Sequence, residues 1–238
     1  MPRRTKTQAL GQHFLLDRRV LAKILDASAV GKGETVCEAG TGNGILTEEL
    51  RRRARRVVSY EVDKALYASA KAALVFSNLE LVNADLFRRD EKFDVFVSNL
   101  PYSKSRDAVE WLATKKFNRA IVMVQKEFAD KLSARPGDQN YRAVSAIASY
   151  CFSIDKLFDV DKECFQPPPL VESTVIRATL KHPITPEIVK NVNRLFSQRN
   201  KRASSVAARF GAPMDFGSDR RVDQLAPEQI IALAGMVK

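Results

Sequence analysis

The stretch that decides the fold of this 238-residue chain is Thr35-Val36-Cys37-Glu38-Ala39-Gly40-Thr41-Gly42-Asn43-Gly44-Ile45-Leu46-Thr47. A short apolar run suited to a buried strand leads into a glycine turn, and the apolar residues that follow indicate a helix. Glycines let the backbone bend tightly and approach a ligand with no Cβ in the way. The segment therefore predicts a strand, a ligand-binding turn and a helix.

The alternation of strand and helix continues along the chain. Further strands are expected over 57–61, 79–83, 93–97 and 120–124, and helices over 18–29, 64–73 and 105–115. These strands are continuously apolar and rich in β-branched residues, which is typical of parallel strands covered on both faces. A helix over 141–152 and two antiparallel strands over 153–160 and 174–180 are expected to complete an α/β domain with a Rossmann-like sheet.

A second region is predicted beyond His182-Pro183. Thr185-Pro186 suits the start of a helix, and apolar residues then recur at helical spacing through Phe196. Shorter helices are expected near 201–209 and 227–236. We therefore expect a domain over 1–182, with a basic N-terminal arm over 1–16, and a small helical domain over 183–238.

The charge suggests the partner class. The chain has 39 Lys plus Arg against 28 Asp plus Glu, a net charge of +11. Such a surplus favours solubility, or binding to nucleic acid or to an anionic lipid surface. The three cysteines form no CxxC pair, so no metal site is expected. No secretory signal or membrane-length apolar run is present, and the expectation is a cytoplasmic monomer with reduced thiols.

Two acidic residues make the glycine turn more specific. Glu61 ends the next predicted strand, where a carboxylate can accept both hydroxyls of a ribose, and Asp85 follows the third, where it can accept an adenine amine. Together with Gly40 and Gly42, they form the pattern of a site for S-adenosylmethionine (SAM). The alternatives are a plain strand–turn–helix connection and an NAD site, although Ile45 stands where the third glycine of G-x-G-x-x-G is required.

The fourth predicted strand leads into Asn99-Leu100-Pro101-Tyr102. The exocyclic amine of adenine is a poor nucleophile, because its lone pair is delocalised into the ring. The Asn99 side-chain oxygen and a backbone carbonyl can accept its two N–H groups and direct the lone pair at a methyl group. Pro101 fixes the backbone, and Tyr102 offers a face for a flipped base. The alternative is a turn that merely ends a strand.

Four segments together resemble the small-subunit ribosomal RNA adenine dimethyltransferases, over essentially the whole chain. They are Gly11-Gln12-His13-Phe14-Leu15, the glycine turn 38–47, Asn99-Leu100-Pro101-Tyr102, and Phe165-x-Pro167-x-Pro169-x-Val171-x-Ser173. The resemblance implies SAM-dependent dimethylation of two adjacent adenines near the 3′ end of small-subunit rRNA, within a pre-ribosomal small subunit.

The resemblance also implies roles for single residues. His13 and Leu15 would contact the methionine end of SAM, and Gly40 would contact the cofactor through its backbone. Glu61 would contact the ribose, and Asp85 the adenine of SAM. Asn99 would bridge cofactor and substrate. Tyr102 and Phe165 would sandwich the target adenine, although an aromatic residue before a proline-rich turn also suits a core. Asn200 stands where many members carry a second basic residue, which leaves the details of ribosome docking open.

Three other functions remain open at this stage. A large-subunit rRNA adenine methyltransferase of the antibiotic-resistance type shares the turn and a similar Asn-x-Pro-[Tyr/Phe] motif. A SAM-binding ribosome-assembly factor with little turnover would need the same binding residues. DNA adenine methylation usually uses Asp-Pro-Pro-Tyr, which is absent. The arginines of the run 51–56 are expected to contact RNA, with a solvated helix end as the alternative.

Overall fold

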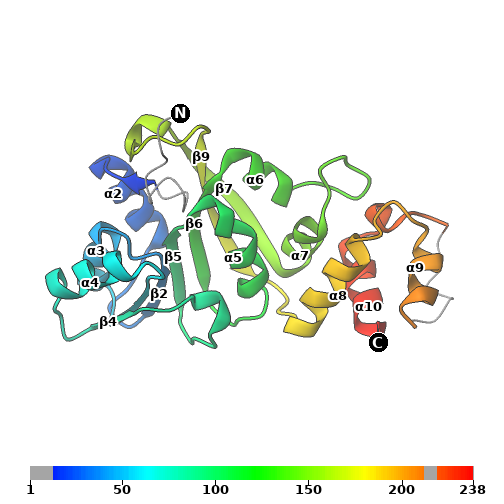
Figure 1. Ribbon diagram of the computed structural model, residues 1–238, viewed down its shortest axis with the longest axis horizontal. Helices are drawn as coiled ribbons and strands as arrows, with labels where there is room; N and C mark the ends of the chain where they lie inside the picture. The colour runs from blue at the N-terminus through cyan, green and yellow to red at the C-terminus, as the bar shows by residue number, and fades with distance from the viewer. Residues whose placement is uncertain (1–12, 212–218, 238) are drawn as a thin grey trace. The chain divides into compact units, whose positions relative to one another are not determined.

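The computed structural model describes residues 13–211 and 219–237 (Figure 1). Most of the predicted basic arm, 1–12, lies outside the described residues. The strands are β1 (Phe14–Leu15), β2 (Thr35–Ala39), β3 (Arg56–Tyr60), β4 (Leu79–Val82), β5 (Val95–Asn99), β6 (Arg119–Gln125), β7 (Phe152–Val160), β8 (Phe165–Gln166) and β9 (Ser173–Leu180). The α-helices are α2 (Arg18–Ser28), α3 (Ile45–Arg53), α4 (Lys64–Ala73), α5 (Ser105–Leu112), α6 (Lys126–Leu132), α7 (Ala143–Cys151), α8 (Pro186–Phe196), α9 (Ala203–Arg209) and α10 (Pro227–Met236).

The chain forms two compact units. The first comprises Met1–Asp107, Lys116–Lys126 and Asp155–Thr179, and the second comprises Ala108–Lys115, Glu127–Ile154 and Leu180–Lys238. The segment 183–238, predicted as a helical domain, therefore belongs to a larger unit that also contains earlier parts of the chain. Among the described residues, no helix has the length and apolarity needed to span a membrane.

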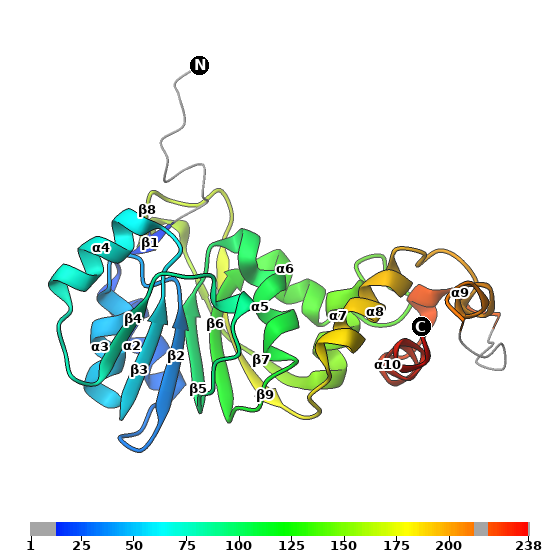
Figure 2. The same ribbon diagram turned by 60° about the horizontal axis from the view of Figure 1, so that its bottom comes forward.

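The main sheet has the strand order β4-β3-β2-β5-β6-β9-β7 (Figure 2). Strands β4, β3, β2, β5 and β6 are parallel, and β9 runs antiparallel to β6. From β2 the chain moves to β3 and β4 on one side and then returns to β5 on the other. Ligands of open α/β sheets bind at such a switch point, beyond the carboxyl ends of the strands. The predicted Rossmann-like α/β class is confirmed.

The core of the first unit follows from strands buried on both faces. Every residue of β2 is buried, and Val36 and Cys37 have no exposed surface. Helix α2 packs on β6 and on α3, while α3 packs on β3 and α4 on β4. Asp17 caps α2 by accepting hydrogen bonds from the amides of Arg19 and Val20, as its position before the apolar run predicts.

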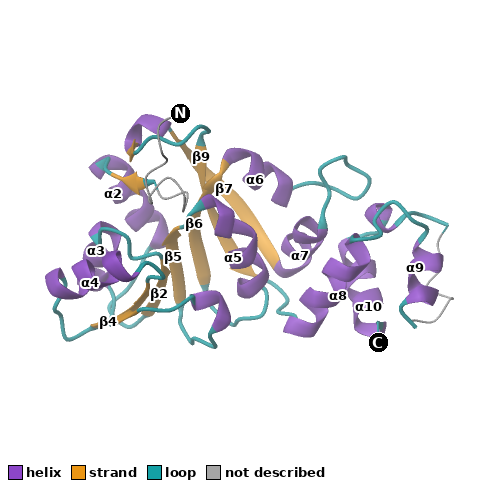
Figure 3. Ribbon diagram, viewed as in Figure 1, coloured by secondary structure: helices purple, strands orange, loops and turns teal. Residues whose placement is uncertain are grey.

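The second unit contains a helical cluster in which α7, α8 and α10 pack on one another. Thr185 caps α8 through the amide of Ile188, and Pro186 occupies the first turn, where its missing N–H costs nothing. The buried Tyr141 ring meets Phe196 edge-on, with ring centroids 5.6 Å apart. Beyond β9 the described chain consists of helices and loops (Figure 3), with one isolated bridge between Arg202 and Arg221.

Candidate active site

A single cavity gathers most of the predicted site residues at the carboxyl ends of the parallel strands. It encloses about 970 Å³ of empty space, including its open mouth. Ligand sites are mostly apolar, with a few polar groups that fix orientation. Its lining includes His13, Leu15, Gly40, Gly42, Glu61, Asp85, Asn99 and Pro101.

The glycine turn has the backbone that its sequence predicts. Gly40, Gly42 and Gly44 have φ values of +84°, +57° and +80°, a region that favours glycine. The Gly40 amide donates to the Tyr60 carbonyl at 2.7 Å, which ties the turn to β3. A Cβ at Gly44 would lie 2.7 Å from Leu74 Cδ1, so a side chain there would displace the packing of α4's end.

Glu61 is positioned by the turn it faces. One carboxylate oxygen accepts from the Gly42 amide at 2.9 Å, and the other accepts from the Asp63 amide at 2.8 Å. An ionised carboxylate has about four acceptor positions, so positions remain for further donors such as ribose hydroxyls. The side chain is buried, and it is therefore held in one orientation before any ligand binds.

Asp85 shares its part of the cavity with a cation that the sequence reasoning missed. Lys104 Nζ lies 3.5 Å from Asp85 and 3.0 Å from Asp107, and both Lys104 and Asp85 line the cavity. The hydrogen bond with Asp107, and the charges of Asp107 and Asp85, raise the pKa of Lys104. In the sequence Lys104 is only a lysine two positions after Tyr102, and ordinary surface lysines occur in similar places.

Glu38 is a second residue whose importance becomes visible only in the structure. It lines the cavity with 1% of its surface exposed, and one oxygen accepts from the hydroxyls of Thr47 and Ser59, each at 2.6 Å. The other oxygen, Oε1, is buried and makes no hydrogen bond to any residue that the structure describes. Burial raises the pKa of Glu38 to about 7. A ligand cation or N–H donor in the cavity would satisfy this oxygen.

The substrate side of the site is assembled from distant segments. Asn99 ends β5, and its amide nitrogen donates to the His13 carbonyl at 3.4 Å, which leaves the side-chain oxygen as an acceptor. The His13 ring stacks on Tyr102, with centroids 5.5 Å apart and planes inclined by 27°. His13 Nδ1 donates to the Pro167 carbonyl at 2.8 Å, and the Tyr102 and Ser173 hydroxyls lie 2.6 Å apart.

Phe165 differs from the other predicted residues. It pairs with Leu15 where β1 meets β8, has 2% of its surface exposed, and belongs to the hydrophobic core of the first unit. It is absent from the cavity lining, as is Tyr102. In this conformation the ring is buried in the core, so it has no open face for a base. An aromatic ring buried in a core contributes to stability through apolar packing. Its role in base binding remains a prediction.

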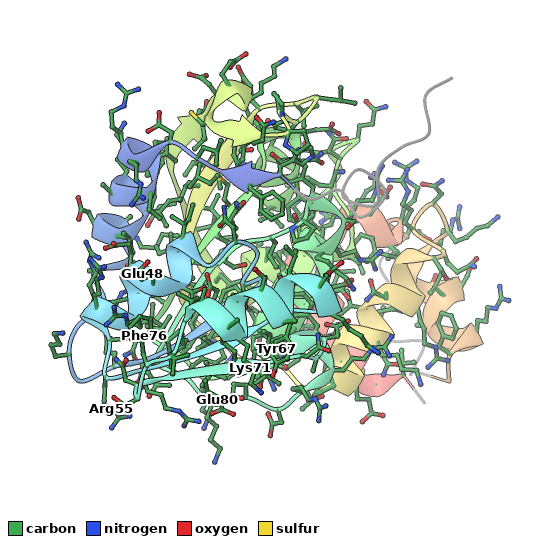
Figure 4. The ribbon with its side chains drawn as sticks, turned by 60° about the vertical axis from the view of Figure 1, so that its left-hand side comes forward. Glu48, Arg55, Tyr67, Lys71, Phe76 and Glu80 are labelled. Atoms are coloured by element: carbon green, nitrogen blue, oxygen red, sulfur yellow. The ribbon has the colours of Figure 1, made fainter. Side chains whose placement is uncertain are left out.

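The arginine run 51–56 is held by internal partners. Arg52 pairs with Glu48 at 2.6 Å and Arg53 with Glu49 at 2.9 Å, while Arg56 pairs with Glu80. Arg51 stacks on the Phe76 ring, and Arg55 donates to Thr35. Figure 4 labels Glu48, Arg55, Phe76 and Glu80 in this region. These partners favour the alternative reading, a charged helix end whose cations neutralise nearby carboxylates and the helix dipole.

A separate group of basic residues lies in the second unit. The segment 199–203 runs beside 220–223, joined by hydrogen bonds that include Ala203 N to Arg220 O at 2.9 Å and Val222 N to Lys201 O at 3.1 Å. The pairing brings four exposed basic residues onto two adjacent segments: Lys201, Arg202, Arg220 and Arg221. We call the two segments 199–203 and 220–223, with these four basic residues, the basic pair of segments.

Comparison with known proteins identifies the family. The sequence matches the ribosomal RNA adenine dimethylase family over residues 3–206. The chain belongs to this family. Its members are SAM-dependent methyltransferases, so SAM is the cofactor of this chain.

Similar proteins in bacteria and archaea cover most of the chain. A "Ribosomal RNA small subunit methyltransferase A" of Thermotoga maritima is 34% identical over 94% of this chain and 82% of its own length. A "Probable ribosomal RNA small subunit methyltransferase A" of Pyrococcus abyssi is 32% identical over 93% of this chain and 88% of its own length.

Solved structures with a similar fold include a dimethyladenosine transferase from Plasmodium falciparum. It has a TM-score of 0.77 and 24% identity, covering 94% of this chain and 99% of its own. A second is the 23S rRNA methyltransferase ErmE, with a TM-score of 0.64 and 27% identity over the same shares of the two chains. The fold is thus shared with an enzyme whose name specifies 23S rRNA as its target.

Proposed function

We propose that the chain transfers methyl groups from SAM to the N6 amines of two adjacent adenines near the 3′ end of small-subunit rRNA. The observation that carries the proposal is the meeting of Asn99-Leu100-Pro101 with the glycine-turn cavity, with Tyr102 next in the chain, in a chain whose curated relatives are small-subunit enzymes. Two N6,N6-dimethyladenosines require four transfers. We infer that the substrate is a pre-ribosomal small subunit in the cytoplasm, and that the enzyme acts as a monomer.

The cavity fits SAM by its donors and acceptors. We assign Glu61 to the ribose hydroxyls and Asp85 to the adenine amine. Gly40 and Gly42 leave the space that a Cβ would occupy, and His13 and Leu15 border the methionine end. The unpartnered Glu38 Oε1 adds a buried acceptor to the same cavity. When bound, SAM supplies an electrophilic methyl group.

The remaining chemistry belongs to the polar end of β5. The Asn99 side-chain oxygen and a backbone carbonyl of 99–101 accept the two N–H groups of the adenine amine. These hydrogen bonds favour a pyramidal nitrogen whose lone pair points at the methyl carbon. Pro101 fixes the direction of the backbone there. The methylated amine is strongly acidic until it loses a proton, so the step needs no strong base from the protein.

The target base must leave its stack to reach Asn99, and we assign its support to Tyr102. In the structure the His13 ring occupies a face of Tyr102. A base that stacks there must displace His13, which is held by one hydrogen bond to Pro167. We further propose that 183–238 binds rRNA, with the basic pair of segments as its phosphate contacts. Such contacts weaken steeply with salt.

The test is methyl transfer from labelled SAM to unmethylated small subunits, with large subunits and naked DNA in parallel, followed by nucleoside analysis. We expect N6,N6-dimethyladenosine from small subunits alone. Label in the large subunit would contradict the proposal and show that the chain is a large-subunit methyltransferase of the resistance type. Binding to small subunits without transfer would replace it with an assembly factor.

A further inference from the structure

Some exposed apolar side chains lie on the cavity or on segments bonded to its lining. Among the described residues, six large hydrophobic side chains are strongly exposed: Leu16, Val62, Val75, Leu170, Val171 and Met236. Val62 lines the cavity, and Leu16 directly follows β1. Leu170 and Val171 lie in the loop between β8 and β9. Leu170 is the extreme case, with 93% of its surface exposed. Single exposed leucines are common, but a concentration beside a ligand site points to an interaction surface.

The loop that carries Leu170 is anchored to the site at both ends. On one side the Pro167 carbonyl accepts from His13, and on the other the Ser173 hydroxyl bonds to Tyr102. Leu170 is three residues from each anchor, so it lies within about 11 Å of both along an extended chain. Prolines at 167, 168 and 169 restrict the backbone between them. The loop therefore presents Leu170 in a fixed place at the substrate side of the site.

The surroundings of the loop favour an apolar contact over a phosphate contact. Lys126, a cation next to the loop among the described residues, has its charge balanced by Glu172 at 2.9 Å and Asp159 at 2.7 Å. The Lys126 amide also donates to the Glu172 carbonyl, which fixes this end of the loop against β6. The loop tip thus offers hydrocarbon, with carboxylates behind it that would repel a phosphate.

We propose that Leu170 contacts the face of the nucleobase next to the target adenine and holds it away from the site. The inference rests on the proposed function. When one base flips out, its neighbours lose a stacking partner, and an apolar side chain can take that place. Leu170 is a positioning residue in this account: it acts on the RNA and touches neither the methyl group nor the reacting amine.

The experiment compares Leu170→Ala with Leu170→Met and with Val75→Ala. Val75 is 79% exposed, lies in the loop between α4 and β4, and does not line the cavity. For Leu170→Ala we expect the KM for the RNA substrate to rise roughly tenfold, from the loss of one buried aliphatic contact. The kcat, the Kd for SAM and the melting temperature should stay near those of the wild type. Leu170→Met should recover most of the loss, and Val75→Ala should show none.

Two further readouts separate this role from others. Because the contact is uncharged, the slope of log Kd against log salt should be the same for Leu170→Ala and the wild type. A 2-aminopurine at the neighbouring position should brighten on binding to the wild type and less on binding to Leu170→Ala.

Four outcomes would overturn the inference: a Leu170→Ala enzyme that matches Val75→Ala, a changed salt slope, an unchanged 2-aminopurine response, or a wild-type dimer that Leu170→Ala dissociates. If the wild type itself transfers no methyl group to small-subunit RNA, the proposed function has failed instead, and Leu170 has not been the cause.

Discussion

The two halves of the site are built in different ways. The cofactor half comes from consecutive strand–turn–helix units, and its residues are fixed by nearby backbone: Glu61, for example, accepts from Gly42 and Asp63. The substrate half joins segments far apart in sequence, since His13 bonds to Pro167 and Tyr102 to Ser173. The first half is therefore organised by the fold itself. The second depends on a few long-range hydrogen bonds and one ring contact that a substrate must rearrange.

The largest expected effect is at the junction of the halves. Asn99→Ala removes the acceptor that orients the adenine amine, and loss of one such preorganised group typically lowers kcat by roughly 10² to 10³-fold. The Kd for SAM should change far less, because the other cavity residues remain. Single-turnover methylation and calorimetric SAM titration measure the two quantities. Full activity in Asn99→Ala would refute the role assigned to this residue.

A smaller effect is expected at Tyr102, where two substitutions separate stacking from hydrogen bonding. Tyr102→Ala removes the stacking face, which is worth about 1 to 3 kcal/mol per base, and should lower kcat/KM for RNA by roughly 5 to 150-fold. Tyr102→Phe loses only the Ser173 hydrogen bond and should retain most activity. Equal losses in the two variants would show that the hydroxyl, and not the ring, carries the function.

Within the cofactor half, the burial of Glu38 should make the stability of the protein depend on pH. Burial raises its folded pKa to about 7 from an ordinary value of 4.5. The folded state therefore holds a proton that the unfolded state releases, so its contribution to stability is complete below about pH 4.5 and declines as pH rises to 7. The decline amounts to at most about 3 kcal/mol. Urea unfolding at pH 5 and pH 8 should show a flatter profile for Glu38→Gln than for the wild type; parallel profiles would contradict the assignment.

The smallest expected effect contrasts the two basic regions. Arg52→Ala breaks an exposed pair with Glu48, and such pairs contribute about 0 to 1 kcal/mol to stability. Because Arg52 is assigned no phosphate contact, RNA affinity should stay near that of the wild type. Lys201→Ala combined with Arg220→Ala should instead weaken binding and reduce the salt slope by roughly two. Filter binding at several salt concentrations measures both. A larger loss of RNA affinity in Arg52→Ala than in the double variant would show that the arginine run 51–56 contacts RNA.

Most of the fold was predictable because its strands and turns are signalled locally. The strand Thr35–Ala39, the helix Lys64–Ala73 and the helix start at Ile45 lie where the sequence places them. The fourth strand was misplaced by two residues: it spans Val95–Asn99 instead of 93–97, because the polar Ser98 and Asn99 still pair with β6. Helix α6 was missed because it begins at Lys126, directly after β6, and no glycine, proline or other turn residue separates the two elements.

The site was predictable where a motif is local and less so where partners are distant. The glycine turn, Glu61 and Asp85 line one cavity, as the order of the strands implies. The stacking of His13 on Tyr102 and the burial of Phe165 depend on contacts between distant segments, which no local spacing encodes. Glu38 and Lys104 were missed because their significance arises from burial and from a neighbouring charge, both properties of the folded chain.

The most direct test of this two-part account is calorimetric titration of SAM into the protein without RNA. The account predicts one SAM per chain, with a similar Kd for the wild type and for Tyr102→Ala, because the fold alone organises the cofactor half. Heat of binding that appears only after RNA is added, or that Tyr102→Ala abolishes, would show that the two halves form together and would contradict the account.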